Sequence, residues 1–401
     1  MRKPISSKNH NKNALALACA FTCAALASSF THAETEYKIG GYVKFDAIFS
    51  QYSDAQRAAS VGDDFLVPST IAVGDGSGEG DMVFDSNAKF SRINFKTTTG
   101  TDVGDVVSFI EMDFNAGNDE RLTNQASNGL RHAFLAWNKP DGSSITAGQT
   151  WSTFFNVGAL PEAVDFIGPT SGSIFVRQPQ VRYTMPMAGG KLMVAAENPS
   201  SGLHDNAAVT AGSYADDNQI DDNTMPDIIG RYDGGAGSLS YSAAVMLRQI
   251  AYNDGTNSES ENATAVSLSG KYVLGNGDDI KVMISSGTLG RYIALNAYRD
   301  GGVKADGSID LTTVTGGYVA YKHMWSPMVR STFSYAFSEA DNSSAITSDV
   351  TKSVNNVYAN LMYSPTKQLT FGGEYMIAER ETESGANGDL TRIQFTSKLS
   401  F

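Results

Sequence analysis

The sequence predicts an all-β fold, a transmembrane antiparallel up-and-down β-barrel of about 16 strands. Three observations predict it. The last stretch, RIQFTSKLSF, alternates polar and apolar side chains and stops on an aromatic residue, as expected of a strand with one polar and one apolar face. Short turns and long loops alternate along the chain, which is typical of bacterial outer-membrane barrels. Beyond the N-terminal region, no apolar stretch is long enough for a membrane-spanning helix.

Residues 1–33 have the pattern of a secretory signal peptide. A basic beginning precedes an apolar run, Ala14–Ala27, and the small residue Ala33 closes a signal-peptidase site. At 14 residues the run is shorter than the roughly 20 residues that a spanning helix needs. Lipidation of Cys19 or Cys23 is the alternative, but neither has a branched aliphatic residue three positions upstream. We therefore predict that residues 1–33 are cleaved.

Residues 34–401 are predicted to form a single barrel domain, because no internal repeat or linker interrupts them. Both cysteines lie in the signal peptide, which excludes a disulfide framework in this domain. The signal peptide also holds four basic and no acidic residues, so the domain keeps 26 Lys and Arg against 43 Asp and Glu, a net charge of −17. That balance argues against a nucleic-acid partner.

Alternation and turn residues place the strands in order. Short connections such as NKPDGS, DGGAG and SPTK carry the Gly, Pro, Asn and Asp that tight turns need. The long loops, notably Tyr52–Asp85, Pro199–Thr224 and Leu289–Thr312, are acidic and rich in Gly and Ser. The expected strands are 38–51, 86–97, 105–115, 129–138, 143–151, 177–186, 190–198, 226–233, 237–250, 262–274, 279–288, 313–323, 327–338, 352–364, 368–379 and 389–401.

The first strand indicates which face meets lipid. One row contains Ile39, Val43 and Phe45, whereas the opposite row contains Lys44 and Asp46. A charged row cannot face hydrocarbon cheaply, so it faces the inside. A barrel of about 16 strands is too wide for side chains to fill, which predicts a water-filled channel.

The predicted inner wall is rich in basic residues although the chain is acidic. Guanidinium groups bind carboxylates in bidentate fashion and keep their charge, so such a lining favours anionic solutes. The alternative is that these cations pair with acids of the inner wall and hold it rigid. The candidate anion-binding residues are Lys44, Arg92, Lys96, Arg131, Arg177, Gln178, Gln180, Arg182, Arg231, Arg248 and Arg330, and the candidate acids are Asp46, Glu111, Asp113, Glu197, Asp227 and Glu374.

One long connection, Ser152–Val176, differs from the others because it is rich in apolar residues such as Phe154 and Phe155. Apolar loop residues need a surface to pack on, so we expect this loop, between the fifth and sixth strands, to fold inward and narrow the channel. Glu162 and Asp165 would then lie across from the arginines and create a transverse field. The alternative is a surface loop that covers a contact between subunits.

Three motifs resemble the DcaP-like outer-membrane porins: GQTWSTFF, VDFIGPTSGSIFVRQPQVRYT and YANLMYSPTKQLTFGGEYMIAER. The resemblance implies a sixteen-stranded trimeric channel whose inward-folded loop and basic wall favour dicarboxylates and other organic anions. The positions that match the family's basic motif are Arg177, Gln178, Gln180 and Arg182. Some members carry a periplasmic coiled coil before the barrel, which is not expected here.

The C-terminal strand is also a candidate assembly signal. Phe395, Leu399 and Phe401 lie on its apolar face, and the resemblance implies that the barrel-assembly machinery recognises the terminal aromatic residue. The other expected partners are outer-membrane lipid, lipopolysaccharide, two further copies of the chain and small anionic solutes.

Other functions have weaker support. A barrel hydrolase would need a histidine beside a nucleophile, and His132, His204 and His323 are scattered. An adhesin or phage receptor with an incidental pore is a further alternative. No cofactor is expected, and the scattered histidines argue against zinc. The acidic stretch VGDGSGEGD has alternating oxygen ligands for calcium, but a solvated loop is the simpler interpretation.

Overall fold

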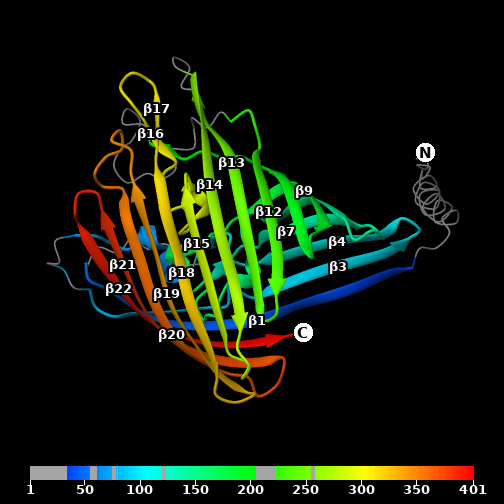
Figure 1. Cartoon of the computed structure of the whole chain (residues 1–401). Helices are drawn as coiled ribbons and strands as arrows, with labels where there is room; N and C mark the ends of the chain where they lie inside the picture. Colours follow the sequence, from blue (N-terminus) through cyan, green and yellow to red (C-terminus); the bar gives the residue numbers. More distant parts are fainter. Residues whose placement is uncertain are drawn as a thin grey trace, which may run out of the picture.

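The computed structural model describes residues 34–54, 61–74, 78, 80–119, 123–204, 223–253 and 258–401. The predicted signal peptide lies outside them. Sixteen antiparallel strands close into a barrel (Figure 1), which confirms the predicted fold class. No helix within the described residues is both long and apolar enough to traverse a bilayer.

Most barrel strands follow the predicted positions closely, because period-two alternation sets both their extent and their faces. The predicted strand 86–97 is the exception, since the chain is interrupted after Asn87 and the barrel strand begins only at Arg92. The barrel strands are β1 (Thr35–Tyr52), β3 (Arg92–Thr101), β4 (Gly104–Asp113), β7 (Gly129–Asn138), β8 (Ser144–Trp151), β9 (Arg177–Met187), β10 (Gly190–Glu197), β12 (Asp227–Ala236), β13 (Leu239–Asn253), β14 (Ser258–Val273), β15 (Asp279–Gly287), β18 (Thr313–Met324), β19 (Val329–Asp341), β20 (Thr351–Tyr363), β21 (Leu369–Thr382) and β22 (Asn387–Ser400).

The shorter elements lie in the connections. They are β2 (Val83–Asn87), β5 (Asn118–Asp119), β6 (Gln125–Ala126), β11 (Leu203–His204), β16 (Gly301–Val303), β17 (Ile309–Leu311), and the 3-10 turns η1 (Val61–Asp63), η2 (Pro68–Thr70), η3 (Val157–Ala159), η4 (Thr170–Gly172) and η6 (Gly290–Tyr292). β2 extends the pairing of β1, and β11, β16 and β17 form a small separate sheet.

The seam between β22 and β1 closes the cylinder, with the red strand beside the blue one in Figure 1. The register runs from Tyr42 opposite Ser400 to Tyr52 opposite Leu390. Beyond it, the backbone N–H of Phe401 donates to the carbonyl of Gly41 at 3.1 Å, and the N–H of Gly41 donates back at 3.3 Å. Closure leaves no unpaired strand edge facing lipid.

Burial distinguishes the two faces of the wall. On the outside, Ile39 is 66% exposed and Phe395 is 53% exposed, whereas Asp46 and Arg392, on the inward faces of the same two strands, are buried. The inward side chains find polar partners inside the barrel, and the outward ones form the apolar band that lipid requires.

The two ends of the barrel differ. At one end the strands are joined by short turns, and this end also holds the beginning of β1 and the C-terminus. At the other end are the long connections. In outer-membrane barrels the short turns face the periplasm and the long loops face outward. We use "short-turn end" and "long-loop end" for these two sides.

The largest buried apolar cluster lies against the inner wall. It joins residues of 152–176, such as Phe154, to residues near η6, such as Ile293, and to inward side chains of the wall, such as Met246. Burying such a side chain contributes about 1.5–3 kcal/mol relative to leaving it exposed. The packing therefore fixes the connection 152–176 against the strands.

Candidate functional site

Residues 152–176 connect β8 to β9, yet their backbone carbonyls accept hydrogen bonds from strands far along the sheet. The carbonyl of Phe155 accepts from Arg231 of β12 at 2.7 Å. The carbonyl of Ala159 accepts from the Tyr318 hydroxyl of β18 at 3.0 Å. The carbonyl of Val164 accepts from Lys44 of β1 at 3.1 Å. Inward side chains from widely separated strands thus bind one short segment.

The tip around η4 lies directly on the backbone of β18. A Cβ atom added to Gly172 would come within 1.9 Å of the carbonyl oxygen of Gly317, so only glycine fits there. The neighbouring Ser171 N–H donates to Asn356 Oδ1 at 3.1 Å, and Asn356 Nδ2 donates to the carbonyl of Gly168 at 2.9 Å. These contacts satisfy backbone groups that would otherwise be buried without partners.

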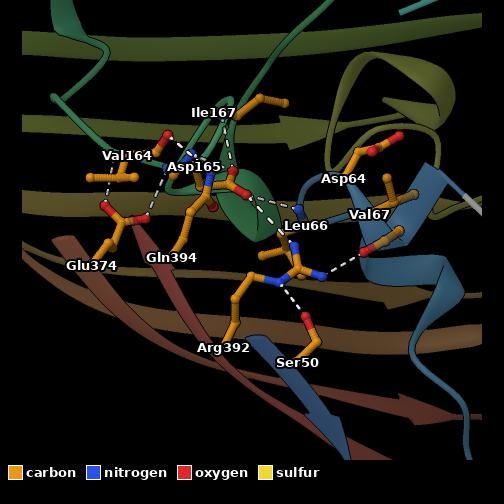
Figure 2. A network of polar contacts seen from close by, with 12 residues as sticks. Ser50, Asp64, Leu66, Val67, Val164, Asp165, Ile167, Glu374, Arg392 and Gln394 are labelled. Carbon is orange, nitrogen blue, oxygen red and sulfur yellow. Dashed lines mark hydrogen bonds and ion pairs between the residues drawn. The ribbon is translucent and has the colours of Figure 1, made fainter. Parts of the chain in front are cut away.

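Two buried carboxylates anchor the middle of the segment (Figure 2). Glu374 of β21 accepts from the N–H of Val164 at 2.8 Å and from the N–H of Asp165 at 3.1 Å. Asp165 accepts from the backbone of Leu66 at 2.9 Å and of Ile167 at 3.1 Å. Buried backbone N–H groups need acceptors, so these contacts define the path of the backbone.

Arg392 links this segment to the barrel seam (Figure 2). Its Nε donates to Ser50 Oγ on β1 at 2.9 Å, its Nη2 donates to the carbonyl of Gly62 at 2.5 Å, and its Nη1 lies 3.9 Å from Asp165 Oδ2. Arg392 itself belongs to β22 and is 1% exposed. The side chain of Arg392 therefore contacts β1, the connection that follows β1, and residues 152–176.

The predicted constriction residues are placed as follows. Glu162 receives a bidentate hydrogen bond from Arg330, with both N···O distances 2.6 Å. Glu162 and Asp165 thus pair with Arg330 and Arg392 rather than with Arg177 or Arg182. Both Phe154 and Phe155 are buried. They pack against the wall, and Phe155 meets the Trp151 ring edge-on at 5.2 Å between centroids.

Five of the predicted cations form close ion pairs with acids. The shortest N···O distances are 2.6 Å for Lys44–Asp46, 2.8 and 2.7 Å for Arg131 with Glu111 and Asp113, 2.6 Å for Arg231–Asp233, 2.5 Å for Arg248–Asp300 and 2.6 Å for Arg330–Glu162. Arg248 also lies 3.5 Å from Asp227. Each of these cations is thus paired with an acid, which is the arrangement that the rigid-wall alternative expects.

Arg177 and Arg182 differ from that group. Neither makes a hydrogen bond or ion pair to any described residue, and Arg177 Nη1 and Arg182 Nε are buried without acceptors. Arg177 stacks over the Trp151 ring at 5.1 Å and lines an open cavity of about 370 Å³ together with Phe166 and Phe175. Arg182 lies on the inward row of β9, because its neighbour Val181 is 58% exposed on the outside.

The two remaining basic candidates, Arg92 and Lys96, differ in how far acids pair with them. Arg92 lies 3.8 Å from Glu111 and stacks on Tyr42 and Phe166, with ring-centroid distances of 5.3 and 5.7 Å. Lys96 is exposed near the short-turn end and has no polar partner within the described ranges. The charge of Arg92 is therefore partly neutralised by Glu111, whereas Lys96 has no acid paired with it among the described residues.

Gln178 and Gln180 are buried and occupied by protein partners. Gln178 donates to Glu197 at 3.2 Å and to the Tyr292 hydroxyl, and it accepts from Arg291. Gln180 donates to the carbonyl of Trp151 at 2.9 Å and accepts from Thr153 at 3.0 Å. Their amides hold the connection between β8 and β9.

Tyr292 of η6 continues this network from a second connection. Burial raises the pKa of its hydroxyl well above the usual value, so the group stays protonated. It donates to Asp227 Oδ2 at 2.7 Å. The η6 region is thereby fixed next to residues 152–176.

The same alternation places three further lysines on the inner wall that are not among the candidate anion-binding residues. Lys271, Lys281 and Lys322 occupy the inward rows of β14, β15 and β18, and they line one cavity with Arg330. Each follows inward serines, alanines or acids at two-residue spacing, so the same rule that identified Lys44 identifies them.

The histidines do not form a catalytic group in the described part of the chain. His132 Nδ1 lies 3.1 Å from Thr150 Oγ1, but both residues are buried. His323 Nδ1 lies 2.9 Å from Asp278 at a short turn and its ring packs on Trp325. No cluster of three or more metal-binding side chains occurs among the described residues. In the acidic VGDGSGEGD stretch, the candidate ligands Asp75, Ser77 and Glu79 lie outside the described residues.

Fold and inner wall together define an outer-membrane protein of the porin class. The chain belongs to the DcaP outer membrane protein family, whose profile matches residues 2–401. This confirms the resemblance seen in the three sequence motifs. Comparison with curated protein sequences gave no match. A channel, rather than an enzyme, is what the family and the barrel indicate.

Several solved structures of outer-membrane proteins have the same fold as this chain. The outer membrane channel DcaP of Acinetobacter baumannii superposes with a TM-score of 0.75 at 23% identity, covering 92% of this chain and 99% of that one. An anion-selective porin from Comamonas acidovorans gives 0.57 at 12% identity, covering 92% and 100%. OmpT of Vibrio cholerae gives 0.54 at 12% identity, covering 93% and 99%.

Proposed function

We propose that this protein forms a water-filled channel for passive diffusion of small hydrophilic solutes across the outer membrane, with a preference for organic anions such as dicarboxylates. The observation that carries the proposal is the pair Arg177 and Arg182, two guanidinium groups of β9 without carboxylate partners. Arg182 lies on the inward row of the strand, and Arg177, its first residue, lines the aromatic cavity. An uncompensated guanidinium attracts anions and binds carboxylates in bidentate fashion.

The spacing of the two arginines fits a path along the wall. They are five residues apart on β9, which corresponds to about 16 Å along a strand. Arg177 lies at the long-loop end beside the aromatic cavity, and Arg182 lies closer to the short-turn end. An anion moving along the channel would leave one guanidinium before it reaches the next, which keeps binding weak enough for release.

We further propose that residues 152–176 narrow this path. Their contacts with β1, β12 and β18–β22 support a course inside the barrel, and the buried carboxylates of Asp165 and Glu374 serve as anchors, not as part of the solute path. Glu162, paired with Arg330 and part-exposed, is the acid that faces solvent in the narrowed region. Gln178 and Gln180 position the segment.

Further aspects of the proposal rest on the family and on the sequence. Two structural relatives are an outer membrane channel and an anion-selective porin, and a further relative is the trimer form of OmpT. We accordingly propose a homotrimer in contact with lipid and lipopolysaccharide. Delivery by a cleaved signal peptide, residues 1–33, is part of the same proposal.

Liposome swelling tests the proposed function directly. Proteoliposomes that contain the folded protein should admit succinate faster than 1,4-diaminobutane, a dication of similar length, and the ratio should fall as salt screens the wall. Equal swelling rates for the two solutes would contradict the proposed anion preference. The absence of swelling with either solute would contradict an open channel.

Deleting Phe401 is expected to reduce the amount of assembled barrel, while export across the inner membrane continues. The deletion removes both backbone hydrogen bonds to Gly41 at the seam, each contributing about 0.5–1.5 kcal/mol. Phe401→Ala keeps these bonds and removes only the ring, which is 62% exposed. The readout is the heat-modifiable band in outer-membrane fractions.

The two variants separate seam pairing from recognition by the assembly machinery. Loss of assembly in both assigns the signal to the aromatic ring of Phe401. Wild-type assembly of both variants would show that Phe401 carries no signal.

A further inference from the structure

A second group of cations lies nearer the short-turn end than residues 152–176. Lys271, Lys281, Lys322 and Arg330 come from four neighbouring strands, β14, β15, β18 and β19. Together with Thr332 they line one cavity of about 300 Å³. The cavity is separate from the one that contains Arg177.

The charges around this cavity do not balance. It contains two acids, Glu162 and Asp279. Arg330 occupies both oxygens of Glu162. Asp279 lies 2.6 Å from Lys322 and 3.6 Å from Lys271. Lys281 donates only to a neutral group, the carbonyl of Leu160, at 2.6 Å. Four cations against two acids leave two positive charges without compensation.

The strand register makes this excess costly for the protein alone. Lys271 and Lys281 are directly opposite each other in the pairing of β14 with β15. Like charges at directly opposed positions destabilise a sheet. On its other side Lys281 is opposite Ala320, whose short side chain leaves room beside the ammonium group. A bound anion between these groups would remove the repulsion.

Thr332 provides an independent indication of a ligand. The residue is 1% exposed, lines the cavity, and its Oγ1 has no hydrogen-bond partner among the described residues. Its backbone N–H, by contrast, is satisfied by Asn360 at 2.8 Å. A buried hydroxyl without a partner costs about 1–3 kcal/mol, and a hydroxyl can donate to an anion.

We propose that this cavity binds a compact, doubly charged tetrahedral oxyanion: hydrogen phosphate or the phosphate group of a small phosphomonoester. Ammonium groups act as point charges and suit phosphate, whereas planar carboxylates are matched by guanidinium forks. The one fork here, Arg330, is already bound to Glu162. Lys271, Lys281 and Lys322 surround the anion, and Thr332 donates to it.

The site goes beyond the anion preference proposed for Arg177 and Arg182, because it involves other residues and another ligand class. It lies between residues 152–176 and the turns at the short-turn end, since Lys271 and Lys322 lie near the ends of β14 and β18. A phosphate on the periplasmic side would therefore reach it without passing Arg177.

Calorimetry on the full-length, detergent-solubilised, folded protein tests the proposal, with inorganic phosphate as the probe. Lys281→Gln is expected to weaken phosphate binding about tenfold, the effect of losing one charge-assisted contact. Thr332→Val should weaken it about fivefold. Lys367→Gln, at an exposed turn of the same end, makes the same change in charge outside the cavity and should bind phosphate as the wild type does.

A second readout is the block of channel current in planar bilayers. Phosphate added on the short-turn side should block at lower concentration than phosphate added on the other side, and Lys281→Gln should abolish this asymmetry. If Lys281→Gln does not assemble, Lys322→Gln replaces it with the same criteria.

Three results would overturn the site: no detectable phosphate binding by the wild type, unchanged binding in the lysine variants, or succinate binding here as tightly as phosphate. Phosphate binding that is about tenfold weaker in Lys281→Gln but unchanged in Arg182→Gln supports it. Because calorimetry needs no ion flux, a failure of the proposed anion preference leaves this test intact.

Discussion

Replacing Arg177 and Arg182 together by glutamine is expected to abolish anion preference and to weaken block of the channel by succinate about tenfold. Each guanidinium contributes one charge-assisted contact to a passing carboxylate, equivalent to about tenfold in affinity. The two sites are about 16 Å apart and hold a succinate one at a time, so both must be changed to remove the block. Neither residue has an ion-pair partner in the described chain, so no buried acid is left exposed by the change.

The matched control is Lys139→Gln with Lys367→Gln. Both lysines lie in short turns, and the double variant makes the same change in net charge away from the inner wall. It should retain wild-type block and selectivity. If the arginine variant is still blocked by succinate at the wild-type concentration, the binding residues lie elsewhere on the wall.

Glu374→Gln is expected to loosen residues 152–176 and raise single-channel conductance. The glutamine side chain has the same size but turns one carboxylate oxygen, which accepts from Val164 or Asp165, into a donor. Leaving a buried N–H group without its acceptor costs about 1–3 kcal/mol, which shifts the docked population about fivefold or more. Added current noise should accompany the larger conductance as the segment exchanges between positions.

Glu379→Gln is the control for that experiment. Glu379 lies on the same strand but is exposed, and its carboxylate accepts from Asn355 at 2.8 Å rather than from the segment. Its conductance should equal that of the wild type. Wild-type conductance and noise in Glu374→Gln would contradict the proposed constriction.

The fold could be predicted because alternation is a local property. Each strand must present apolar side chains to lipid and polar ones to the interior, so two-residue periodicity identified both strand positions and facing directions. Phe395 outside and Arg392 inside are an example within one strand. The same rule would have added Lys271, Lys281 and Lys322 to the candidate set.

The pairing of charges could not be predicted, because partners are far apart in the sequence. Arg330 meets Glu162 across 168 residues, and Arg248 meets Asp300 across 52. Alternation places each of these arginines on the inner wall but does not say which acid reaches it. The separation of paired cations from the unpaired Arg182 therefore required the three-dimensional arrangement.

The anchoring of residues 152–176 was equally inaccessible from sequence. Apolar composition predicted that the segment packs on a surface, and Phe154 is buried. The role of Asp165 depends on backbone N–H groups of Leu66 and Ile167 and on Arg392 from the last strand. Such contacts join three distant parts of the chain and leave no local pattern.

The zero-current potential of the wild-type channel in a KCl gradient tests the central claim, anion preference, most directly. With identical solutions apart from salt concentration, the sign of the potential reports which ion permeates more readily. We predict the sign that corresponds to a higher permeability for chloride than for potassium. The magnitude of the potential should decrease as salt screens the charges of Arg177 and Arg182. A potential of the opposite sign, indicating potassium over chloride, would contradict the account.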